Sequence, residues 1–489
     1  MPELTLDAPS RLTAPRGTLE AAPARVAMHN ARRVGGRVLV TSDGGDRAML
    51  SEADYARYLS GTVTDDEPLG KELLDKSLLR DRLDLPWLAR RLSERHLLDW
   101  GGVNVHTIVV TRRCNFKCLY CHASVVGADD LSTDMSLETA RQVVDLIFQS
   151  PSPTLMLEFQ GGEPLLNWPV IKFIVGYAKL KNKAAKRALH FGLISNFSLL
   201  DDETLEFLAA HGVSFCTSLD GPEDLHNQNR LYLGGNSHAH VVAALKKIQA
   251  RRAGGLKLDT PNAICTVTRQ SFGRHREIID QLVGLGLERV QFGPLDPIGF
   301  ARKSWPQIGY TSAEFVEFYG QALDYLIELN LKGVRAYEKM TLILLIRALQ
   351  GGHWRFPNAD GLARLAYNHD GAVYTCEDAR LLAAEGDPFF KIGDAATATY
   401  GSLLEHPTVR ASTLAALPYS QPQCSQCAYS AYCTVMPVYN HQTQGGLWGR
   451  MPDNGWCEKM MGLFDLIFAK LEDPGSRKVL ESWLEFKDR

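Results

Sequence analysis

Residues 105–124 read VHTIVVTRRCNFKCLYCHAS, an apolar run followed directly by a loop that carries three cysteines. The run is rich in β-branched residues, which predicts a buried strand. Cys114, Cys118 and Cys121 then follow at steps of four and three residues. Three thiols are an odd set for disulfides and are one short of a closed four-ligand metal site. The stretch therefore indicates a metal centre with one open position at the end of a strand.

The spacing of these three thiols suits a cubane iron–sulfur cluster, whose iron corners prefer thiolate ligands. Three corners would be held by the protein, and the fourth iron would stay open for a substrate or cofactor. Arg112, Arg113 and Lys117 lie in or beside the same loop, and their positive charge would offset that of an anionic cluster. A zinc loop or a set of buried thiols is the alternative interpretation.

Six apolar, β-rich runs alternate with helical patterns between residues 104 and 293. Six strand-then-helix repeats predict a parallel α/β sheet, because parallel neighbours need a crossover connection. Since a closed barrel of this type has eight units, we expect an open, partial (β/α)6 barrel. The predicted strands are Val105–Thr111, Thr154–Phe159, Leu189–Ser195, Val213–Ser218, Asn262–Thr268 and Arg289–Gly293.

The remaining sequence divides around this barrel. Ser136 is a plausible N-cap of the first barrel helix, and Gly212 is placed to end the helix that begins at Asp202. We expect a flexible tail at 1–30, a small α/β module at 31–100, the barrel at 101–300, a helical connector at 301–368, a cysteine-rich domain at 369–460 and a C-terminal helix at 461–489.

Composition narrows the functional classes. The formal net charge of −3 gives no reason to expect nucleic acid or an anionic membrane as a partner. No stretch reaches the roughly 18 uninterrupted apolar residues of a spanning helix, and the N-terminus lacks the apolar core of a signal peptide. Most of the ten cysteines lie in two tight groups, which in a reducing compartment favours metal over disulfides. We therefore expect a cytoplasmic protein.

CNFKCLYC at 114–121 resembles the CxxxCxxC signature of the radical S-adenosylmethionine (SAM) superfamily. Three further elements follow successive predicted strands in the family's order. Gln160-Gly161-Gly162-Glu163-Pro resembles its GGEP motif, which contacts the methionyl part of SAM through closely approaching backbone. Ser195-Asn196 resembles its ribose-contacting turn, and Ser218 with Arg230 resembles its carboxylate contacts.

This resemblance implies a [4Fe–4S] cluster bound to the three cysteines and to SAM. An electron from the cluster would cleave SAM reductively, and the resulting 5′-deoxyadenosyl radical would abstract a hydrogen atom from the substrate. The protein would supply binding, orientation and protection of the radical.

A second cysteine group at 424, 427, 433 and 457 resembles the SPASM domain of peptide-modifying radical enzymes. That domain usually holds two auxiliary clusters, but here Pro437 stands where another cysteine is expected, and no Gly-x4-Cys element follows Gly393. The resemblance therefore implies one auxiliary [4Fe–4S] cluster, held by Cys424, Cys427, Cys433 and Cys457. A structural zinc on the same cysteines is the alternative. We interpret Cys216, Cys265 and Cys376 as buried core thiols, since free cysteine is among the most buried residue types.

Residues 100–470 resemble, more narrowly, the radical SAM maturases of the His-Xaa-Ser peptide system. The likeness rests on long stretches such as TSLDGPEDLHNQNR at 217–230 and CSQCAYSAYCTVMPVYNHQTQG at 424–445. It implies a ribosomally made precursor peptide with His-Xaa-Ser repeats as substrate, a second radical SAM maturase as partner and an external electron donor. The module at 31–100 would either bind a leader peptide by strand addition or brace the barrel.

Three functions are compatible with these patterns. The leading hypothesis is an enzyme that installs a carbon-centred modification on a peptide, such as a crosslink between side chains. The second is a maturase of the sulfatase type, which oxidises a Cys or Ser of a protein partner to formylglycine. The third is a non-catalytic, cluster-bearing subunit that presents the peptide to a partner enzyme. The intact cysteine triad and cofactor contacts favour the first two.

Overall fold

The computed structural model describes residues 25–96, 101–121, 123–297, 300–350 and 360–486. The chain divides into two compact units, residues 1–91 and 92–489. Residues 1–24 of the predicted flexible tail lie outside the described residues. In the described ranges, no helix is both long and apolar enough to span a membrane.

The first unit is a three-stranded antiparallel sheet followed by helices. The strands have the order β1-β2-β3, and the core between sheet and helices contains Val40, Leu50, Tyr58 and Leu73. Its elements are β1 (Asn30–Val34), β2 (Arg37–Thr41), β3 (Arg47–Leu50), α1 (Glu52–Leu59), α2 (Pro68–Asp75) and α3 (Leu85–His96), the last of which extends past the division. In the sequence, GRVLVTSDGGDRAML at 36–50 predicts two strands around a turn, and helical patterns follow near 51–60, 68–78 and 84–97. The structure has these five elements and adds β1.

The second unit is built on a parallel sheet whose first six strands neighbour one another in chain order. The order β12-β10-β8-β7-β6-β4 is that of an open (β/α)6 barrel, so the predicted fold class is confirmed. The strands are β4 (Val105–Thr111), β6 (Thr154–Gly161), β7 (Ala188–Ile194), β8 (Val213–Ser218), β10 (Asn262–Thr266) and β12 (Phe292–Gly293).

The sixth predicted strand, Arg289–Gly293, is split into two short pieces. β12 pairs with β10 in the main sheet, whereas β11 (Arg289–Val290) pairs with β13 (Tyr337–Glu338). The prediction of one continuous strand is therefore wrong, because the chain changes pairing partner at Gln291, between the two pieces.

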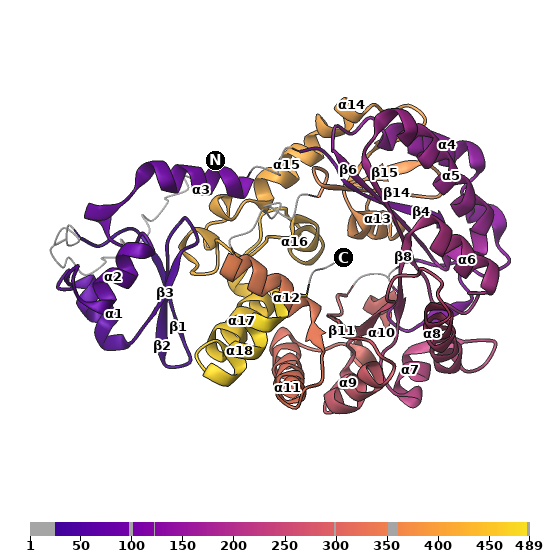
Figure 1. Ribbon diagram of the computed structural model, residues 1–489. Helices are drawn as coiled ribbons and strands as arrows, with labels where there is room; N and C mark the ends of the chain where they lie inside the picture. The colour runs from indigo at the N-terminus through magenta and orange to yellow at the C-terminus, as the bar shows by residue number, and fades with distance from the viewer. Residues whose placement is uncertain (1–24, 97–100, 122, 298–299, 351–359, 487–489) are drawn as a thin grey trace, which may run out of the picture. The chain divides into compact units, whose positions relative to one another are not determined.

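Helices cover the outer face of this sheet, as Figure 1 shows for α4, α5, α6 and α8. Ser136 caps α4 by accepting the Thr139 amide, and Gly212 ends α6 with φ of 60°, as predicted. The covering helices and their connections are α4 (Leu137–Ile147), α5 (Trp168–Ala185), α6 (Asp202–His211), α7 (Glu223–Asn229), α8 (Ser237–Ala253), α9 (His275–Gly284), α10 (Phe300–Ile308), α11 (Ser312–Leu331) and α12 (Lys339–Leu345).

The sheet continues on the other side of β4 with three strands from the C-terminal part of the chain. β14 (Arg364–Tyr367) pairs in parallel with β4, and β15 (Ala372–Tyr374) and β16 (Lys391–Asp394) follow as antiparallel neighbours. The segment expected as a helical connector, 301–368, thus ends in a strand of the main sheet, and its residues 351–359 lie outside the described residues. The first cysteine loop and the C-terminal region therefore share one sheet.

The C-terminal part is mainly helical. The predicted single helix after residue 460 is instead two helices, because Asp473 caps a new one that begins with Pro474. The elements are α13 (Glu377–Ala384), α14 (Tyr400–Leu404), α15 (Pro407–Ala416), α16 (Pro437–Gln444), α17 (Gly455–Lys470) and α18 (Pro474–Trp483).

Candidate active site

The three cysteines of the first group lie in the loop that follows β4, at the carboxyl ends of the parallel strands. Within this loop the short strand β5 (Phe116–Cys118) pairs antiparallel with β9 (Arg230–Tyr232), which places Cys118 opposite Arg230. The amide of Cys114 donates to the carbonyl of Val126. All three cysteines line one cavity of about 550 Å³. The structure therefore brings together the three residues that the sequence singles out.

The donor set of this cavity fits a cluster with one open corner. Burial raises the pKa of the Cys114 and Cys121 thiols and raises that of Cys118 to about 12. Such thiols become thiolates when a metal binds them, since metal binding displaces the proton. In the described part of the chain, the lining includes no fourth cysteine, histidine or carboxylate. Three thiolates and one open corner are what this arrangement can offer an iron–sulfur cluster.

The basic residues of the loop are predicted to offset cluster charge, but not all of them are placed to do so. Arg113 is buried and forms an ion pair with Asp134 at 2.7 Å, and it also donates to the carbonyl of Leu166. Arg112 donates to the carbonyl of Ser124. The charge of Arg113 is therefore balanced inside the protein, and its contacts fold the loop. Lys117 lines the cavity and stays a candidate for offsetting cluster charge.

Arg230 is held by a buried carboxylate that the sequence analysis did not single out. Its guanidinium pairs with Asp220 at 3.1 Å and lies over the ring of Tyr120, at 5.1 Å from the centroid. The hydroxyl of Tyr120 donates to the same carboxylate, which also accepts the Thr266 amide. Asp220 lies within the TSLDGPEDLHNQNR stretch at 217–230. No hydrophobic periodicity in that stretch indicates that this acid is fully buried. This group fixes the cysteine loop against the fourth and fifth barrel strands.

Gly161 and Gly162 allow two backbones to approach each other closely. A Cβ on Gly161 would lie 2.2 Å from the carbonyl oxygen of Thr111, and one on Gly162 would lie 2.2 Å from that of Arg113. No side chain fits at such distances. Both glycines are thus required by packing against the start of the cysteine loop. Their predicted approach to SAM stays a prediction.

Glu163 links the carboxyl ends of the second and third barrel strands, β6 and β7. Its buried carboxylate accepts the Ser195 hydroxyl at 2.8 Å and the Asn196 amide at 2.8 Å, as well as the Leu165 amide. Burial raises the pKa of Glu163 to about 7. The carboxylate therefore positions the turn that the sequence assigns to ribose contact.

Asn196 extends this link to the cysteine loop, because its side-chain amide donates to Asn115 at 2.9 Å. Gln160 donates to Glu158 on the inner face of β6. Ser218 ends β8 and is partly exposed. These predicted cofactor contacts all lie at strand ends around the cysteine loop, and Asn115 is the member that the sequence analysis missed.

The second cysteine group also comes together. The thiols of Cys424, Cys427, Cys433 and Cys457 act electrostatically on one another, and burial raises the pKa of Cys424 to about 12. Cys457 lies in the first turn of α17, where Asn454 caps its amide. Among the described residues, no group of three metal-binding side chains is spaced for a single ion. The auxiliary [4Fe–4S] cluster and the structural zinc therefore both stay predictions for this group.

Of the remaining thiols, Cys265 and Cys376 are buried, as predicted. Cys216 is only partly buried, so that prediction is wrong. The reason is its place on β8, where its side chain faces the barrel interior near Glu158.

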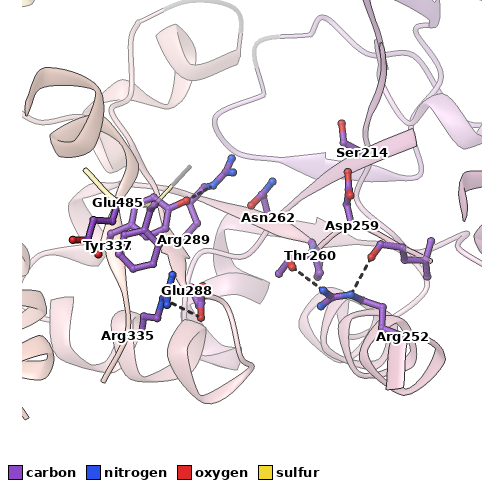
Figure 2. Close-up of a pocket in the computed structure, with 13 residues that line it drawn as sticks. Ser214, Arg252, Asp259, Thr260, Asn262, Glu288, Arg289, Arg335, Tyr337 and Glu485 are labelled. Carbon is purple, nitrogen blue, oxygen red and sulfur yellow. Dashed lines mark hydrogen bonds and ion pairs between the residues drawn. The ribbon is translucent and has the colours of Figure 1, made fainter. Parts of the chain in front are cut away.

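A second cavity, of about 520 Å³, lies at the opposite ends of the strands. Ser214 near the start of β8, Asn262 at the start of β10 and Arg289 at the start of β11 line it, and Figure 2 shows their polar side chains with Arg252 and Arg335. Arg335 pairs with Glu288 at 3.7 Å. Because barrels of this kind place their chemistry at the carboxyl ends of the strands, the cysteine cavity is the candidate active site.

Comparison with known proteins agrees with this geometry. Residues 108–277 match the family model described as the radical SAM superfamily. The chain is 26% identical to the uncharacterised protein MJ0907 of Methanocaldococcus jannaschii, over 40% of this chain and 64% of that protein. It is 23% identical to a cysteine-type anaerobic sulfatase-maturating enzyme of Clostridium perfringens, over 54% of this chain and 71% of that enzyme.

Among solved structures, Streptococcus suis SuiB bound to the precursor peptide SuiA shares the fold, with a TM-score of 0.53 and 12% identity over 87% of this chain and 98% of SuiB. The match to MJ0907 spans slightly less than two thirds of that protein. The family match starts inside β4 and ends in α9. Residues 108–277 therefore match the radical SAM superfamily, and this region contains the cysteine triad and the strand ends around it.

Proposed function

We propose that this enzyme is a peptide maturase that cleaves SAM at the three-cysteine site and removes a hydrogen atom from a ribosomally made precursor peptide with His-Xaa-Ser repeats. The bound cluster and SAM would supply the 5′-deoxyadenosyl radical. The product would carry a carbon-centred modification, such as a crosslink between two side chains.

One observation carries the proposal: a second group of four cysteines gathers in the same unit as the radical SAM triad. A closed set of four thiolates can hold an auxiliary [4Fe–4S] cluster, and it leaves no position for substrate on the iron. Such a cluster can accept the electron that a substrate radical releases when a new bond forms. The fold shared with SuiB, whose structure contains a precursor peptide, supports a peptide substrate.

The residues around the first cavity take the following roles in this proposal. Cys114, Cys118 and Cys121 hold the open cluster. The backbone of the Gln160–Glu163 turn would contact the methionyl group of SAM, Ser195 and Asn196 the ribose, and Ser218 and Arg230 the carboxylate. Arg230 suits an anion, because it stays charged at its buried position beside Asp220, which raises its pKa.

The first unit would bind the leader segment of the precursor. Its sheet ends in β1 on one side and β3 on the other, and a peptide strand can add to such an edge through backbone hydrogen bonds. A second radical SAM maturase acting on the same peptide and an external electron donor complete the proposed system, located in the cytoplasm.

The experiment is anaerobic reconstitution followed by incubation with SAM, a reductant and a synthetic peptide that carries His-Xaa-Ser repeats. We expect 5′-deoxyadenosine, and we expect the peptide to lose two hydrogen atoms in mass, with a fragment pattern that reveals a crosslink. The Cys114→Ala/Cys118→Ala/Cys121→Ala variant is the control and should give neither product. SAM cleavage without any change in the peptide would reject the proposed substrate.

The relative from Clostridium perfringens favours one competing function, the oxidation of a Cys or Ser side chain to formylglycine. The same assay with a cysteine-containing peptide from a sulfatase separates the two. Formation of an aldehyde that hydrazine probes can trap would support the competing function, and an unmodified sulfatase peptide would exclude it.

A further inference from the structure

Lys459 is a buried lysine beside the second cysteine group. It lies on α17, two positions after Cys457, and only 5% of the residue is exposed. Its ammonium nitrogen Nζ lies 2.9 Å from the carboxylate of Asp296. Taking a charged pair out of water costs free energy, and apolar residues in its place are often at least as stabilising. A buried ion pair of this kind therefore calls for a role other than stability, such as fixing two segments in one relative position.

The side chain of Lys459 contacts the frame that holds the second cysteine group. Nζ lies 5.7 Å from the ring centroid of Tyr439 on α16 and 5.9 Å from that of Trp456 on α17. Aromatic faces at these distances attract a cation. The indole N–H of Trp456 donates to the carbonyl of Thr434, the residue after Cys433, at 3.0 Å. The ammonium group is thus tied to both segments that carry these cysteines.

Asp296 belongs to the barrel, where it follows β12 at the carboxyl end of the sixth strand. The amide of Leu295 donates to the hydroxyl of Tyr310 at 2.6 Å. The carbonyl of Pro297 accepts the side-chain amide of Gln442, on α16, at 2.8 Å. Two neighbouring residues of this turn therefore contact the helices of the second group, Asp296 on α17 and Pro297 on α16.

The chain that follows this turn reaches the first cysteine group through α10. The hydroxyl of Ser304 donates to the carbonyl of Leu119, inside the three-cysteine loop. Ser304 also lines the cysteine cavity. The described residues between β12 and the end of α10 therefore contact both cysteine groups, the second through Asp296 and the first through Ser304.

Other contacts of α17 hold the helix against α11. The two helices pack together, and Lys470, the last residue of α17, pairs with Asp324 of α11. Local turns set the shape of the second cysteine group itself. The pair of Lys459 and Asp296 instead lies next to the turn of α17 that carries Cys457, and it joins this turn to the end of the sixth barrel strand. It is therefore placed to set where the second group lies relative to the barrel.

We propose that Lys459 and Asp296 are positioning residues, whose ion pair sets the distance between the second cysteine group and the radical SAM cavity. The inference rests on the proposed function, in which the second group holds a one-electron acceptor. In that reaction the substrate carbon radical bonds to a second substrate atom that carries a hydrogen. The bond to hydrogen breaks, the proton passes to water, and one electron passes to the oxidised auxiliary cluster. Because transfer of this electron slows as the distance grows, a displaced second group should slow product formation and leave SAM cleavage intact.

The first test measures the distance between the two clusters and needs no substrate. Pulsed electron paramagnetic resonance of the reconstituted, dithionite-reduced protein reports the dipolar coupling between two paramagnetic [4Fe–4S] clusters, and wild-type protein should give one narrow coupling. Asp296→Leu/Lys459→Met replaces both charges by apolar side chains, so it should keep the fold and about eight irons. Its coupling should be broadened or shifted. An unchanged coupling in this variant would overturn the inference.

Two further variants make the distance measurement specific. Asp296→Lys/Lys459→Asp restores the pair with its charges exchanged, and it should recover part of the wild-type coupling. Asp324→Asn is the matched control, because it removes the partner of Lys470 at the other end of α17, where the Asp324 side chain is 68% exposed. This control should leave the coupling unchanged. A shift as large in Asp324→Asn as in the apolar double variant would show that any disturbance of α17 moves the second group, and the ion pair would then have no special role.

The second test separates radical formation from product formation with the synthetic His-Xaa-Ser peptide. In Asp296→Leu/Lys459→Met, 5′-deoxyadenosine should form within about twofold of the wild-type rate, while peptide product falls by roughly 10²-fold, the scale of loss that a displacement of about 1 Å can cause. The KM for the peptide should stay the same, because the substrate site is not altered. Equal losses of 5′-deoxyadenosine and product would show a general structural role and would contradict the inference.

The outcomes distinguish the inference from the proposed function. If wild-type protein cleaves SAM but changes no peptide, the proposed function fails, and the coupling between the clusters alone decides whether the ion pair positions the second group. If wild-type protein makes product and the apolar double variant makes it equally fast, the proposed function stands and the ion pair is not a positioning device. About four irons in a wild-type protein that still makes product would leave no second cluster to position, and the inference alone would fail.

Discussion

The two cysteine groups of this protein are held in different ways. Cys118 belongs to a paired strand, and the side chains of Asn115 and Tyr120 bind residues that follow the third and fourth barrel strands. The second group instead uses local structure, with Cys424 in a 3₁₀ turn and Cys457 in the capped first turn of α17. The first loop is thus positioned by the barrel, while the second group is positioned by its own turns and by contacts between its two segments, such as the Trp456 side chain donating to the Thr434 carbonyl.

This difference has a functional meaning. A cluster that binds SAM must present one corner in a fixed direction, so its loop needs contacts with the strand ends that bind SAM. A closed cluster needs only four thiolates at the right distances. We therefore expect damage to the barrel contacts to affect SAM cleavage, and damage to the second group to affect only what happens to the substrate radical.

The largest effect should come from Cys114→Ala/Cys118→Ala/Cys121→Ala. Reconstituted wild-type protein should contain about eight irons in two [4Fe–4S] clusters, and the variant about four. SAM cleavage should disappear entirely. Elemental analysis and Mössbauer spectroscopy measure the iron, and chromatography measures 5′-deoxyadenosine. About four irons in the wild type and none in the variant would show that the second group holds no cluster.

The opposite pattern is expected from Cys424→Ser/Cys457→Ser. Iron should again fall to about four, but SAM cleavage should persist and only the modified peptide should be lost, because the open cluster stays intact. Zinc in the wild-type protein that disappears from this variant, with iron unchanged, would establish the structural zinc alternative for the second group.

A smaller effect should follow from Asp220→Asn, which leaves the buried Arg230 without its charged partner. Breaking a buried ion pair on one side costs about 3–5 kcal/mol, so we expect lower stability and weaker SAM binding by the folded fraction. Denaturant unfolding and equilibrium binding of SAM measure the two effects. Asp202→Asn is the matched control, since its exposed side chain pairs with Lys247 on the surface. Equal losses in both variants would contradict a special role for Asp220.

The sequence predicts the barrel and the clustering of the cysteines because both rest on short-range patterns. Strands such as Thr154–Gly161 alternate clearly, and thiols at steps of four and three must lie in one loop. The partners of these motifs are harder to predict. Asp220, Asp134 and Asn115 act on residues up to about a hundred positions away, and no local pattern marks them. The pairing of β14 with β4 likewise joins segments about 260 residues apart.

The smallest of these effects should come from Gly162→Ala, which tests the close approach between the second strand end and the cysteine loop. The added methyl group would meet the carbonyl oxygen of Arg113 at 2.2 Å, so the backbone on one side must move. Overpacking of this kind typically costs about 1–3 kcal/mol. We expect that loss in unfolding free energy, together with slower SAM cleavage, because the displaced backbone carries Cys114, the proposed cluster ligand, at the next position.

Gly176→Ala is the matched control within the same βα unit. Gly176 lies inside α5 with nothing within 4 Å of an added Cβ, so alanine should stabilise the helix by about 0.5–1 kcal/mol and leave SAM cleavage unchanged. If Gly162→Ala instead behaves like Gly176→Ala, the cysteine loop tolerates displacement of its first residues. The position of the open cluster would then depend on β5, β9 and Asp220, and no longer on the turn after the second barrel strand.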